Sequence, residues 1–272
     1  MMQKNITFVG IGNMAASLIG GLIQNGHTPS LIHASDIDNQ RCQLLEDRLG
    51  IKTYQDNLAA IENADVVIIC VKPNHVKQVL LELKSSLSRD KPLILSIAAG
   101  VPIAKIQTTL ATDIPIIRCM PNTPALVSSG ASALCANKLV TEAQKALAES
   151  ILRAVGLTVW LEDESLMDVV TALSGSGPAY FFLVMECLQN AAVKSGLDAK
   201  VARVLTLQTA LGAAKMALES EHDVAELRRQ VTSPQGTTAA AVDVLIQNDL
   251  DKIFLQAIES AIQRGRELAK LV

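Results

Sequence analysis

The sequence predicts two domains, an α/β domain built on a parallel sheet and an all-helical domain that follows it. Up to about residue 161, short apolar runs alternate with amphipathic stretches, which is the pattern of strands and helices in a parallel sheet. After the segment "EDES" at 162–165 the strand signals stop and long helical patterns follow. A chain of 272 residues is also near the size at which one hydrophobic core stops growing. We therefore expect domains at residues 1–162 and 163–272.

The predicted elements follow from the spacing of apolar residues. Strands are expected at residues 6–10, 31–35, 66–71, 93–98, 116–120, 131–136 and 158–161. Helical patterns between the early strands cover residues 14–26, 38–49, 73–86 and 102–110, and those of the second domain cover 164–173, 178–195, 199–220, 223–230, 237–247 and 251–270. The stretch "VLTLQTALGAAKMALES" is apolar around most of its circumference, which predicts burial on more than one side and hence a partner subunit.

Composition and charge exclude several classes of protein. The formal net charge of −3 offers no basic surface, so we expect neither nucleic acid nor an anionic membrane as a partner. No uninterrupted apolar run reaches the roughly 18 residues that span a bilayer, and the N-terminus lacks a signal-peptide pattern, so a cytoplasmic location is expected. The five cysteines have no CxxC spacing and the four histidines are scattered, which predicts reduced thiols and no metal site.

A glycine motif follows the first predicted strand directly and opens a helix. The segment Gly10 to Ala15, "GIGNMA", has the GxGxxA pattern in the context that a dinucleotide-binding loop requires. The first glycine makes the tight turn, the second lets the backbone approach a pyrophosphate, and the alanine permits close packing of helix on strand. A nicotinamide nucleotide is favoured over FAD, because nothing later in the chain resembles a flavin domain.

The choice between NADPH and NADH stays open at this stage. An acidic residue at the end of the second strand typically binds the ribose 2′-hydroxyl and selects NAD, whereas hydroxyl, amide or arginine side chains suit NADP. The segment "SDIDNQR" at 35–41 carries both kinds, since Ser35, Asn39 and Arg41 surround Asp36 and Asp38.

Further motifs come at later strand ends and in the helical half. They are "VKP" at 71–73, "SIAAGV" at 96–101, "RCMPNTP" at 118–124, "LSGSGPAY" at 173–180, "SPQGTT" at 233–238 and "RGREL" at 264–268. Together with the glycine loop these motifs resemble the pyrroline-5-carboxylate reductase family, over nearly the whole chain. The resemblance implies an enzyme that reduces the C=N bond of 1-pyrroline-5-carboxylate to L-proline, the last step of proline biosynthesis, with NADPH and with NADH as the alternative.

The resemblance also implies a fold, an assembly and a set of site residues. The fold is a Rossmann-type domain followed by an all-α dimerisation domain, similar to the C-terminal domain of 6-phosphogluconate dehydrogenase, and the homodimers often form larger rings such as a decamer. The implied cofactor-binding residues are Gly10, Ile11, Gly12, Asn13, Met14, Ala15, Ser35, Asn57, Val71, Lys72, Pro73, Ala98 and Ala99. The implied substrate-binding residues are Glu164, Ser233, Gly236, Thr237 and Thr238. Gln230 stands where some relatives have Asn, which leaves its contact with the cofactor open.

The chemistry explains why "SPQGTT" contains no strong acid or base. A cyclic imine is protonated near neutral pH and becomes an amine when it accepts hydride, so its site needs positioning more than acid catalysis. We expect Gly236 to Thr238, at the start of a helix, to bind the substrate carboxylate. We assign the catalytic role to Thr238, whose hydroxyl either donates to the ring nitrogen or helps to hold the carboxylate.

Two other functions compete with this one. A β-hydroxyacid dehydrogenase typically carries a catalytic Lys four residues beyond the second glycine of a GxG segment, and Phe181 stands at that place here. A nucleotide-binding scaffold without catalysis would keep the glycine loop but would have no need of "MPNTP" and "SPQGTT". Both alternatives are therefore disfavoured.

Overall fold

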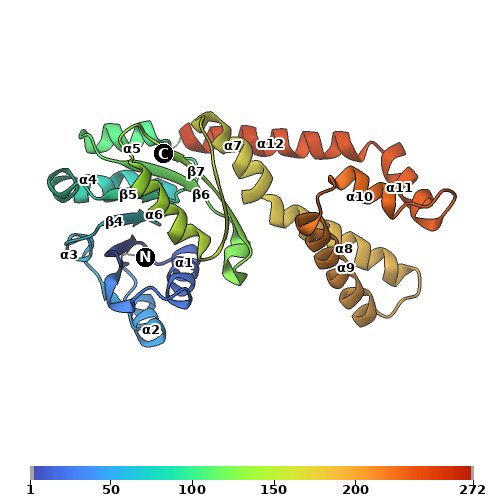
Figure 1. Ribbon diagram of the computed structural model, residues 1–272, viewed down its shortest axis with the longest axis horizontal. Helices are drawn as coiled ribbons and strands as arrows, with labels where there is room; N and C mark the ends of the chain where they lie inside the picture. The colour runs from blue at the N-terminus through green and yellow to red at the C-terminus, as the bar shows by residue number, and fades with distance from the viewer. Residues whose placement is uncertain (1–2, 271–272) are drawn as a thin grey trace. The chain divides into compact units, whose positions relative to one another are not determined.

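The computed structural model describes residues 3–270. The chain divides into two compact units, shown in Figure 1. One unit holds the chain up to Ser176 together with the segment from Ala261 onward, and the other is Gly177–Ser260. The last helix, α12 (Leu250–Lys270), therefore contributes residues to both units. Each unit is described by itself.

The first unit is built on a sheet that, in the described residues, has eight strands in the order β3-β2-β1-β4-β5-β6-β7-β8. The strands are β1 (Ile6–Val9), β2 (Ile32–Ser35), β3 (Lys52–Tyr54), β4 (Val66–Ile69), β5 (Leu93–Ser96), β6 (Ile116–Met120), β7 (Gly130–Ala136) and β8 (Gly156–Trp160). The strands from β3 to β6 are parallel, with Ile6 of β1 paired to Ile32 of β2 on one side and to Val66 of β4 on the other. The strand order reverses between β1 and β4, which is the point where open α/β sheets bind ligands.

The prediction of a parallel sheet was wrong for its last two strands, and it missed β3. Strand β7 is antiparallel to β6, and β8 is parallel to β7. The connection from β6 to β7 is residues 121–129, containing only the 3-10 turn η2 (Thr123–Val127), and so short a link cannot make the crossover that parallel neighbours need. Strand β3 has the sequence "KTY", which carries no apolar run.

Helices cover both faces of the sheet. The helices of the first unit are α1 (Asn13–Gln24), α2 (Asn39–Leu49), α3 (Asn57–Ala60), α4 (Pro73–Asp90), α5 (Ile103–Leu110), α6 (Glu142–Arg153) and α7 (Met167–Val170), with the short turns η1 (Pro29–Leu31) and η3 (Glu164–Leu166) and the π turn η4 (Thr171–Gly175). On β1, Ile6 and Phe8 join the apolar cluster formed with α1, α2 and α6, whereas Val9 joins the cluster formed with α4 and α5. This alternation follows from the period of two along a strand.

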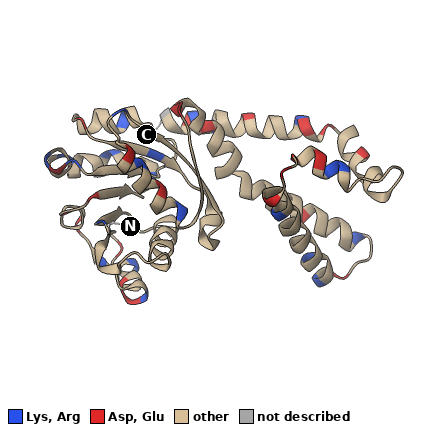
Figure 2. Ribbon diagram, in the orientation of Figure 1, with Lys and Arg blue, Asp and Glu red and all other residues tan. Residues whose placement is uncertain are grey.

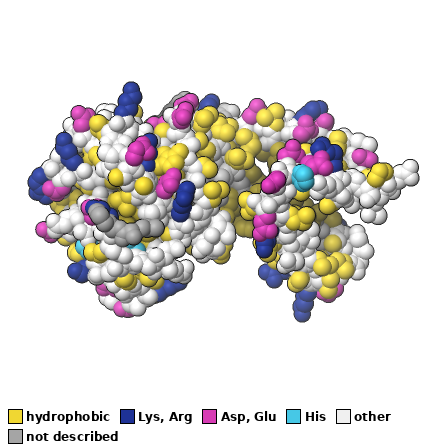
Figure 3. All heavy atoms as spheres, viewed as in Figure 1, with side chains coloured by type: hydrophobic (Ala, Val, Ile, Leu, Met, Phe, Trp, Pro, Cys, Tyr) yellow, Lys and Arg dark blue, Asp and Glu magenta, His cyan; other side chains and the backbone are white. Residues whose placement is uncertain are grey.

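The second unit consists of helices. They are α8 (Gly177–Lys194), α9 (Ala199–Glu219), α10 (Val224–Gln230), α11 (Thr237–Gln247) and the first half of α12. Within residues 177–260 only Gly177 and Ala202 are buried, and hydrophobic side chains are visible at the surface of these helices in Figure 3. The charges of both signs are interspersed along the chain, as Figure 2 shows. The predicted helices agree with these bounds to within a few residues.

One helical stretch of the described residues, Glu164–Lys194, passes a test of length and mean hydropathy for crossing a bilayer. The most apolar window of this stretch is 22% buried. Polar residues such as Asp168, Ser174 and Glu186 interrupt the stretch, so the sequence contains no uninterrupted apolar run there. A core helix of a protein outside membranes passes the same test, so the stretch by itself is weak evidence for a membrane span.

Candidate functional site

The first glycine of the loop after β1 is required by both its backbone angle and its surroundings. Gly10 has φ of +97°, a conformation that side-chain-bearing residues rarely adopt. A Cβ atom there would lie 2.9 Å from Val71 Cγ1 and 3.0 Å from the carbonyl carbon of Cys70. The loop therefore passes directly against the end of β4, at the point where the strand order reverses.

The second glycine and the helix that follows leave room for an anion. Gly12 precedes α1, and a Cβ atom at this residue would meet nothing within 4 Å. Its carbonyl accepts the first helical hydrogen bond, from Ala16 N at 3.0 Å, and no side chain of the described residues caps the helix. The first N–H groups of α1 are thus available to a phosphate, and the helix dipole favours its charge. Ala15 is fully buried against the sheet, as close packing of helix on strand requires.

The end of β2 supplies polar groups next to this loop. Ser35 Oγ donates to Asn57 Oδ1 at 2.7 Å, and Asn57 Nδ2 donates to Glu82 Oε2 at 3.2 Å. Asp36 Oδ2 accepts a hydrogen bond from Ile11 N at 2.7 Å. One network therefore links the glycine loop and β2, and a second links β2 to α3 and α4.

A cavity of about 380 Å³ lies over these groups, within the usual range for small-molecule and cofactor sites. The structure brings seven of the predicted cofactor-binding residues together around it: Gly10, Ile11, Gly12, Ser35, Asn57, Val71 and Lys72. The other predicted residues lie on α1, at the first position of α4 and after β5, and do not line this cavity: Asn13, Met14, Ala15, Pro73, Ala98 and Ala99. The open glycine, the bare helix start and the cavity together fit a dinucleotide.

The cavity wall also contains Asp36 and Arg41, which the sequence offered for the choice of cofactor, and residues that were not predicted. The residues that were not predicted are Ile37, Cys70, His75, Gln78, Val79 and Glu82. Four of these are on α4, with the spacing of one helix face that points toward the glycine loop. That spacing is present in the sequence and becomes informative once the helix is known to begin at Pro73, directly after the strand end.

Cys70 lines the cavity and is not a strong nucleophile. Burial, and to a lesser degree the neighbouring Cys119, raises the pKa of the Cys70 thiol far above its usual range. This thiol therefore stays protonated and is a poor nucleophile. Among residues 3–270, no group of three or more His, Cys, Asp or Glu side chains could hold a metal ion.

Glu164, a predicted substrate-binding residue, lies in the first unit at the start of η3. Its Oε1 accepts from Ile103 N at 2.8 Å and from Arg118 Nη1 at 3.0 Å. The side chain of Arg118 is only 7% exposed, so this ion pair is largely buried. Glu164 thus joins the start of α5, the strand β6 and the turn η3, and its contact with substrate stays a prediction.

The "MPNTP" and "LSGSGP" motifs meet each other within the first unit. Asn122 Nδ2 donates to the carbonyl of Ser174 at 3.0 Å, and Asn122 Oδ1 accepts from Ala131 N at 2.8 Å. Ser174 belongs to the π turn η4, and a Cβ atom at Gly175 would lie 2.6 Å from Met120 Cε. Isolated π turns are frequent at functional sites, and here Asn122 fixes the turn from the side of the sheet.

The "SPQGTT" segment lies in the second unit and forms a tight turn into α11. Gly236 N donates to the carbonyl of Ser233 at 3.0 Å, and Gln235 has φ of +60°. Proline at the second position and a positive φ at the third are typical of a type II turn. Helix α11 begins at Thr237 without a side-chain cap from the described residues, so its first N–H groups are available to a carboxylate. Thr238 is exposed in the single chain.

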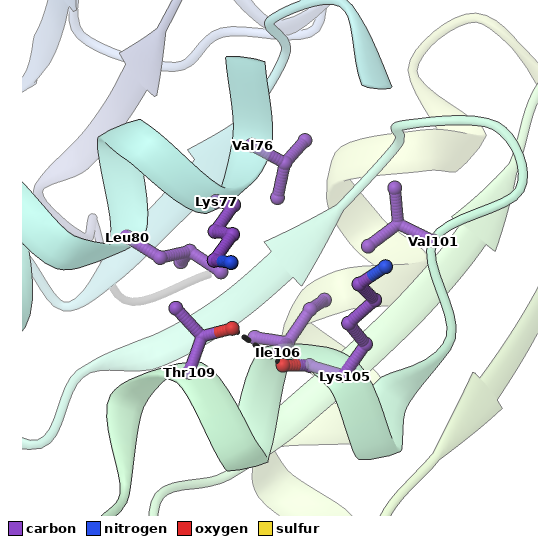
Figure 4. A pocket seen from close by; sticks show the side chains of 7 residues that line it. All are labelled: Val76, Lys77, Leu80, Val101, Lys105, Ile106 and Thr109. Carbon is purple, nitrogen blue, oxygen red and sulfur yellow. Dashed lines mark hydrogen bonds between the residues drawn. The ribbon is translucent and has the colours of Figure 1, made fainter. Parts of the chain in front are cut away.

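A second hollow lies between α4 and α5 and is shown in Figure 4. Its volume is about 10 Å³, close to the least that holds one water molecule. The hollow is lined by Val76, Lys77, Leu80, Val101, Lys105, Ile106 and Thr109. It is too small for a substrate, and the polar Thr109 Oγ1 donates to the carbonyl of Lys105 at 2.8 Å within α5.

Comparison with known proteins identifies the family. A family model described as pyrroline-5-carboxylate reductase dimerisation matches residues 164–268. A second family model, described as NADP oxidoreductase, coenzyme F420-dependent, matches residues 5–100. A pyrroline-5-carboxylate reductase of Pseudomonas aeruginosa is 48% identical over 270 residues, which cover 99% of this chain and 98% of the relative. The chain belongs to the pyrroline-5-carboxylate reductase family.

Solved structures agree with this result and confirm the predicted fold class. A pyrroline-5-carboxylate reductase from Coxiella burnetii superposes with a TM-score of 0.94 at 47% identity, over 98% of both chains. A pyrroline carboxylate reductase from Plasmodium falciparum, solved with NADP bound, superposes with a TM-score of 0.86 at 28% identity, over 99% of both chains. The stretch 164–194 belongs to the matched dimerisation region, which gives its apolar surface an explanation other than a membrane.

Proposed function

We propose that the chain is an NAD(P)H-dependent reductase that converts 1-pyrroline-5-carboxylate to L-proline, the last step of proline biosynthesis. The observation that carries the proposal is the likeness to pyrroline-5-carboxylate reductases over the full length of the chain. The cavity at the strand reversal and the turn before α11 agree with it, because one suits a dinucleotide and the other an anion. The nicotinamide cofactor supplies the hydride when bound.

The cofactor would be held mainly by backbone and small side chains. The glycine loop and the bare start of α1 face the pyrophosphate, and Gly12 lets the backbone approach it closely. Ser35 and Asn57, already joined by a hydrogen bond, would contact the adenosine ribose. The remaining predicted cofactor-binding residues stay in the proposal: Asn13, Met14, Ala15, Val71, Lys72, Pro73, Ala98 and Ala99.

The substrate would be positioned by the "SPQGTT" turn. A protonated imine is already electrophilic at carbon, so the residues around it need to orient the ring and balance its carboxylate. We assign the carboxylate to the segment Gly236 to Thr238, where the N–H groups of Thr237 and Thr238 at the start of α11 would bind it. The Gly236 N–H, which donates to the Ser233 carbonyl, closes the turn that presents them. Glu164 is the remaining proposed substrate residue, and it would act with one oxygen engaged by Arg118.

Thr238 is the proposed catalytic residue, and its hydroxyl is the group to test. Replacement by Ala should lower kcat/KM for pyrroline-5-carboxylate at least about tenfold, because one hydrogen bond to a charged group is lost. Thr238→Val, which keeps the shape without the hydroxyl, should behave like Ala, whereas Thr238→Ser should retain most activity. Thr108→Ala, an exposed threonine on α5, serves as the matched control. Unchanged kinetics in Thr238→Val would contradict the assignment.

The same assay decides between the proposal and its two competitors. Oxidation of NADPH or NADH that depends on added pyrroline-5-carboxylate supports the reductase. Oxidation of a β-hydroxyacid with NAD(P)+ would instead favour the dehydrogenase, which lacks its lysine here because Phe181 stands in that place. Binding of NADP+ without any turnover would favour the scaffold.

We further propose the organisation and location of the protein. Domains at 1–162 and 163–272 are supported by the dimerisation match, which begins at residue 164. That match also supports a homo-oligomer built through the helical half, with dimers joined in a larger ring such as a decamer as the finer proposal. Light scattering coupled to size exclusion would measure the number of subunits, and cell fractionation would test the cytoplasmic location.

A further inference from the structure

Asp36 directs its carboxylate back toward the glycine loop. It lies at the end of β2, and its Oδ2 accepts from Ile11 N at 2.7 Å, a short distance typical of a charge-assisted hydrogen bond. Its Oδ1 accepts from Asp38 N at 3.0 Å. Both oxygens are therefore engaged by backbone N–H groups, one of them at the centre of the pyrophosphate loop.

The backbone next to Asp36 is also hydrogen-bonded to the glycine loop. Gly10 N donates to the carbonyl of Ser35 at 2.8 Å, so the backbone of the loop is tied to β2 immediately before the carboxylate contact. Ile37, the next residue after Asp36, has a side chain that is 93% exposed and lines the cavity. Asp36 and Ile37 both line the cavity, and the carboxylate of Asp36 is engaged there by the N–H of the loop residue Ile11.

An acidic residue in this place is usually interpreted as the group that binds the ribose 2′-hydroxyl and rejects NADP. In this chain the carboxylate has a different partner. A loop that must present N–H groups to a pyrophosphate has few contacts of its own, and an anionic acceptor at Ile11 N fixes one of its peptide planes. Such a contact would stabilise the loop that binds the pyrophosphate, which NADPH and NADH have in common.

We infer that Asp36 is a positioning residue that fixes the glycine loop for either nucleotide, and that discrimination between NADPH and NADH falls to Arg41. The inference rests on the proposed dinucleotide function of the cavity. Arg41 is on the first turn of α2 and lines the same cavity. Its Nε lies 3.2 Å from Asp38 Oδ2, and its side chain is 59% exposed. The contact orients the planar guanidinium, whose other N–H groups suit a 2′-phosphate.

Asp38 has a role of its own in this arrangement. Its side chain caps α2 by accepting from Gln40 N at 3.0 Å and Arg41 N at 3.3 Å. The same residue therefore fixes the helix start and the guanidinium that projects from it. The other charged groups on the cavity wall are Asp36, Lys72 and Glu82, and Glu82 is engaged by Asn57.

The test compares binding of NADP+ and NAD+ with the dynamics of the free loop. Asp36→Ala should raise the Kd of both nucleotides by about tenfold, as expected for loss of charge-assisted contacts, and leave their ratio within about twofold. Hydrogen exchange of the peptide that contains Ile11 should become faster in the free protein. Arg41→Gln should raise the Kd of NADP+ and of 2′,5′-ADP by at least about tenfold and leave the Kd of NAD+ within about twofold of its natural value. Calorimetry measures all the dissociation constants.

Matched controls exist for both variants. Asp198→Ala removes a carboxylate that likewise accepts two backbone N–H bonds, at the start of α9. Arg48→Gln removes a positive charge from the last turn of the same helix as Arg41. Neither residue lines the cavity, so both variants should bind the two nucleotides like the natural chain. Asp36→Asn, which keeps one oxygen, replaces the alanine variant if the latter does not fold.

Distinct results would overturn the inference. If Asp36→Ala weakens NAD+ alone and NADP+ binds as well or better, Asp36 is the ribose-selecting acid after all. If hydrogen exchange of the peptide that contains Ile11 is unchanged in Asp36→Ala, Asp36 does not position the loop. If Arg41→Gln raises the Kd of NADP+ and of NAD+ equally, Arg41 does not discriminate between the two nucleotides. If the natural chain binds neither nucleotide, the proposed function fails, while the exchange experiment still decides the role of Asp36 in the loop. Nucleotide binding without reduction of pyrroline-5-carboxylate contradicts the proposed reaction and leaves the inference standing.

Discussion

The two units of the chain use their apolar side chains in opposite ways. In the first unit the residues of the sheet and its helices enclose each other, and Phe8, Ile68 and Leu83 are completely buried. In the second unit, residues 177–260, large apolar side chains are exposed on every helix, including Phe181 at 67% and Leu211 at 62%. Contiguous exposed apolar surface is typical of a protein interface. The first unit therefore has a core of its own, whereas the second needs another subunit to bury its helices.

The largest expected effect comes from placing a charge on the second unit. Leu211→Glu introduces a carboxylate in the middle of α9, where a partner subunit is expected to cover it. An unpaired charge at an interface costs several kcal/mol, so the dissociation constant of the dimer should rise by about a thousandfold, roughly 4 kcal/mol. Sedimentation velocity over a range of concentrations would measure the change.

The control for this change is a leucine of similar exposure in the first unit. Leu44 on α2 is 65% exposed, and Leu44→Glu should leave the dimer and the melting temperature essentially unchanged, since single exposed apolar residues are ordinary. Equal effects of the two substitutions would show that exposure in the second unit has no special meaning.

Most of the fold follows from local patterns in the sequence. Strand β4 is a continuous apolar run and β5 is apolar up to its last residue, and the helices from α8 to α12 are stretches without strand signals that are separated by turn residues. The direction of β7 could not be read in this way, because it depends on the length of the link through η2 and not on the residues of the strand. The strand β3 was missed because three residues with a lysine make no apolar signal.

The candidate site likewise contains residues that a local sequence pattern predicts and contacts that it does not. The glycine loop is a contiguous motif, so its residues were predicted, and Gly10 and Gly12 have the backbone and space that the motif requires. The engagement of Asp36 by Ile11 joins residues far apart in the chain, and a sequence pattern shows only the residue type. The wall formed by His75, Gln78 and Glu82 was missed for a similar reason, since polar residues on a helix are usually solvent-exposed.

The buried ion pair between Arg118 and Glu164 allows the stability of the first unit to be tested separately from dimerisation. Arg118→Met should lower the free energy of unfolding by about 3 kcal/mol, because Glu164 loses its charged partner in a largely buried place. Among the described residues, Ile103 N then remains as the donor to Glu164 Oε1. The dimer dissociation constant should stay the same. Urea unfolding at a fixed protein concentration measures the effect.

The control is an arginine in an exposed pair of the same unit. Arg89 Nε lies 2.7 Å from Asp90 Oδ1 with its side chain 73% exposed, so Arg89→Met should leave the free energy of unfolding essentially unchanged. Glu164→Gln separates the two roles of that residue. A loss of stability with an unchanged KM for pyrroline-5-carboxylate would remove Glu164 from the substrate site, and a raised KM in a stable protein would support its predicted contact.

The smallest effects are expected at the two glycines of the loop, which separate stability from binding inside the first unit. Gly10→Ala should lower the free energy of unfolding by about 2 kcal/mol, because φ of +97° is strained for alanine and its Cβ would press on Val71.

Gly12→Ala should change the free energy of unfolding by less than about 1 kcal/mol, since φ is −86° and the Cβ meets open space. That same space is where the pyrophosphate must approach, so Gly12→Ala should raise the Kd of NADP+ by at least about tenfold. Calorimetry and urea unfolding on both variants measure the two quantities. Tight NADP+ binding by Gly12→Ala would show that the pyrophosphate does not approach this loop.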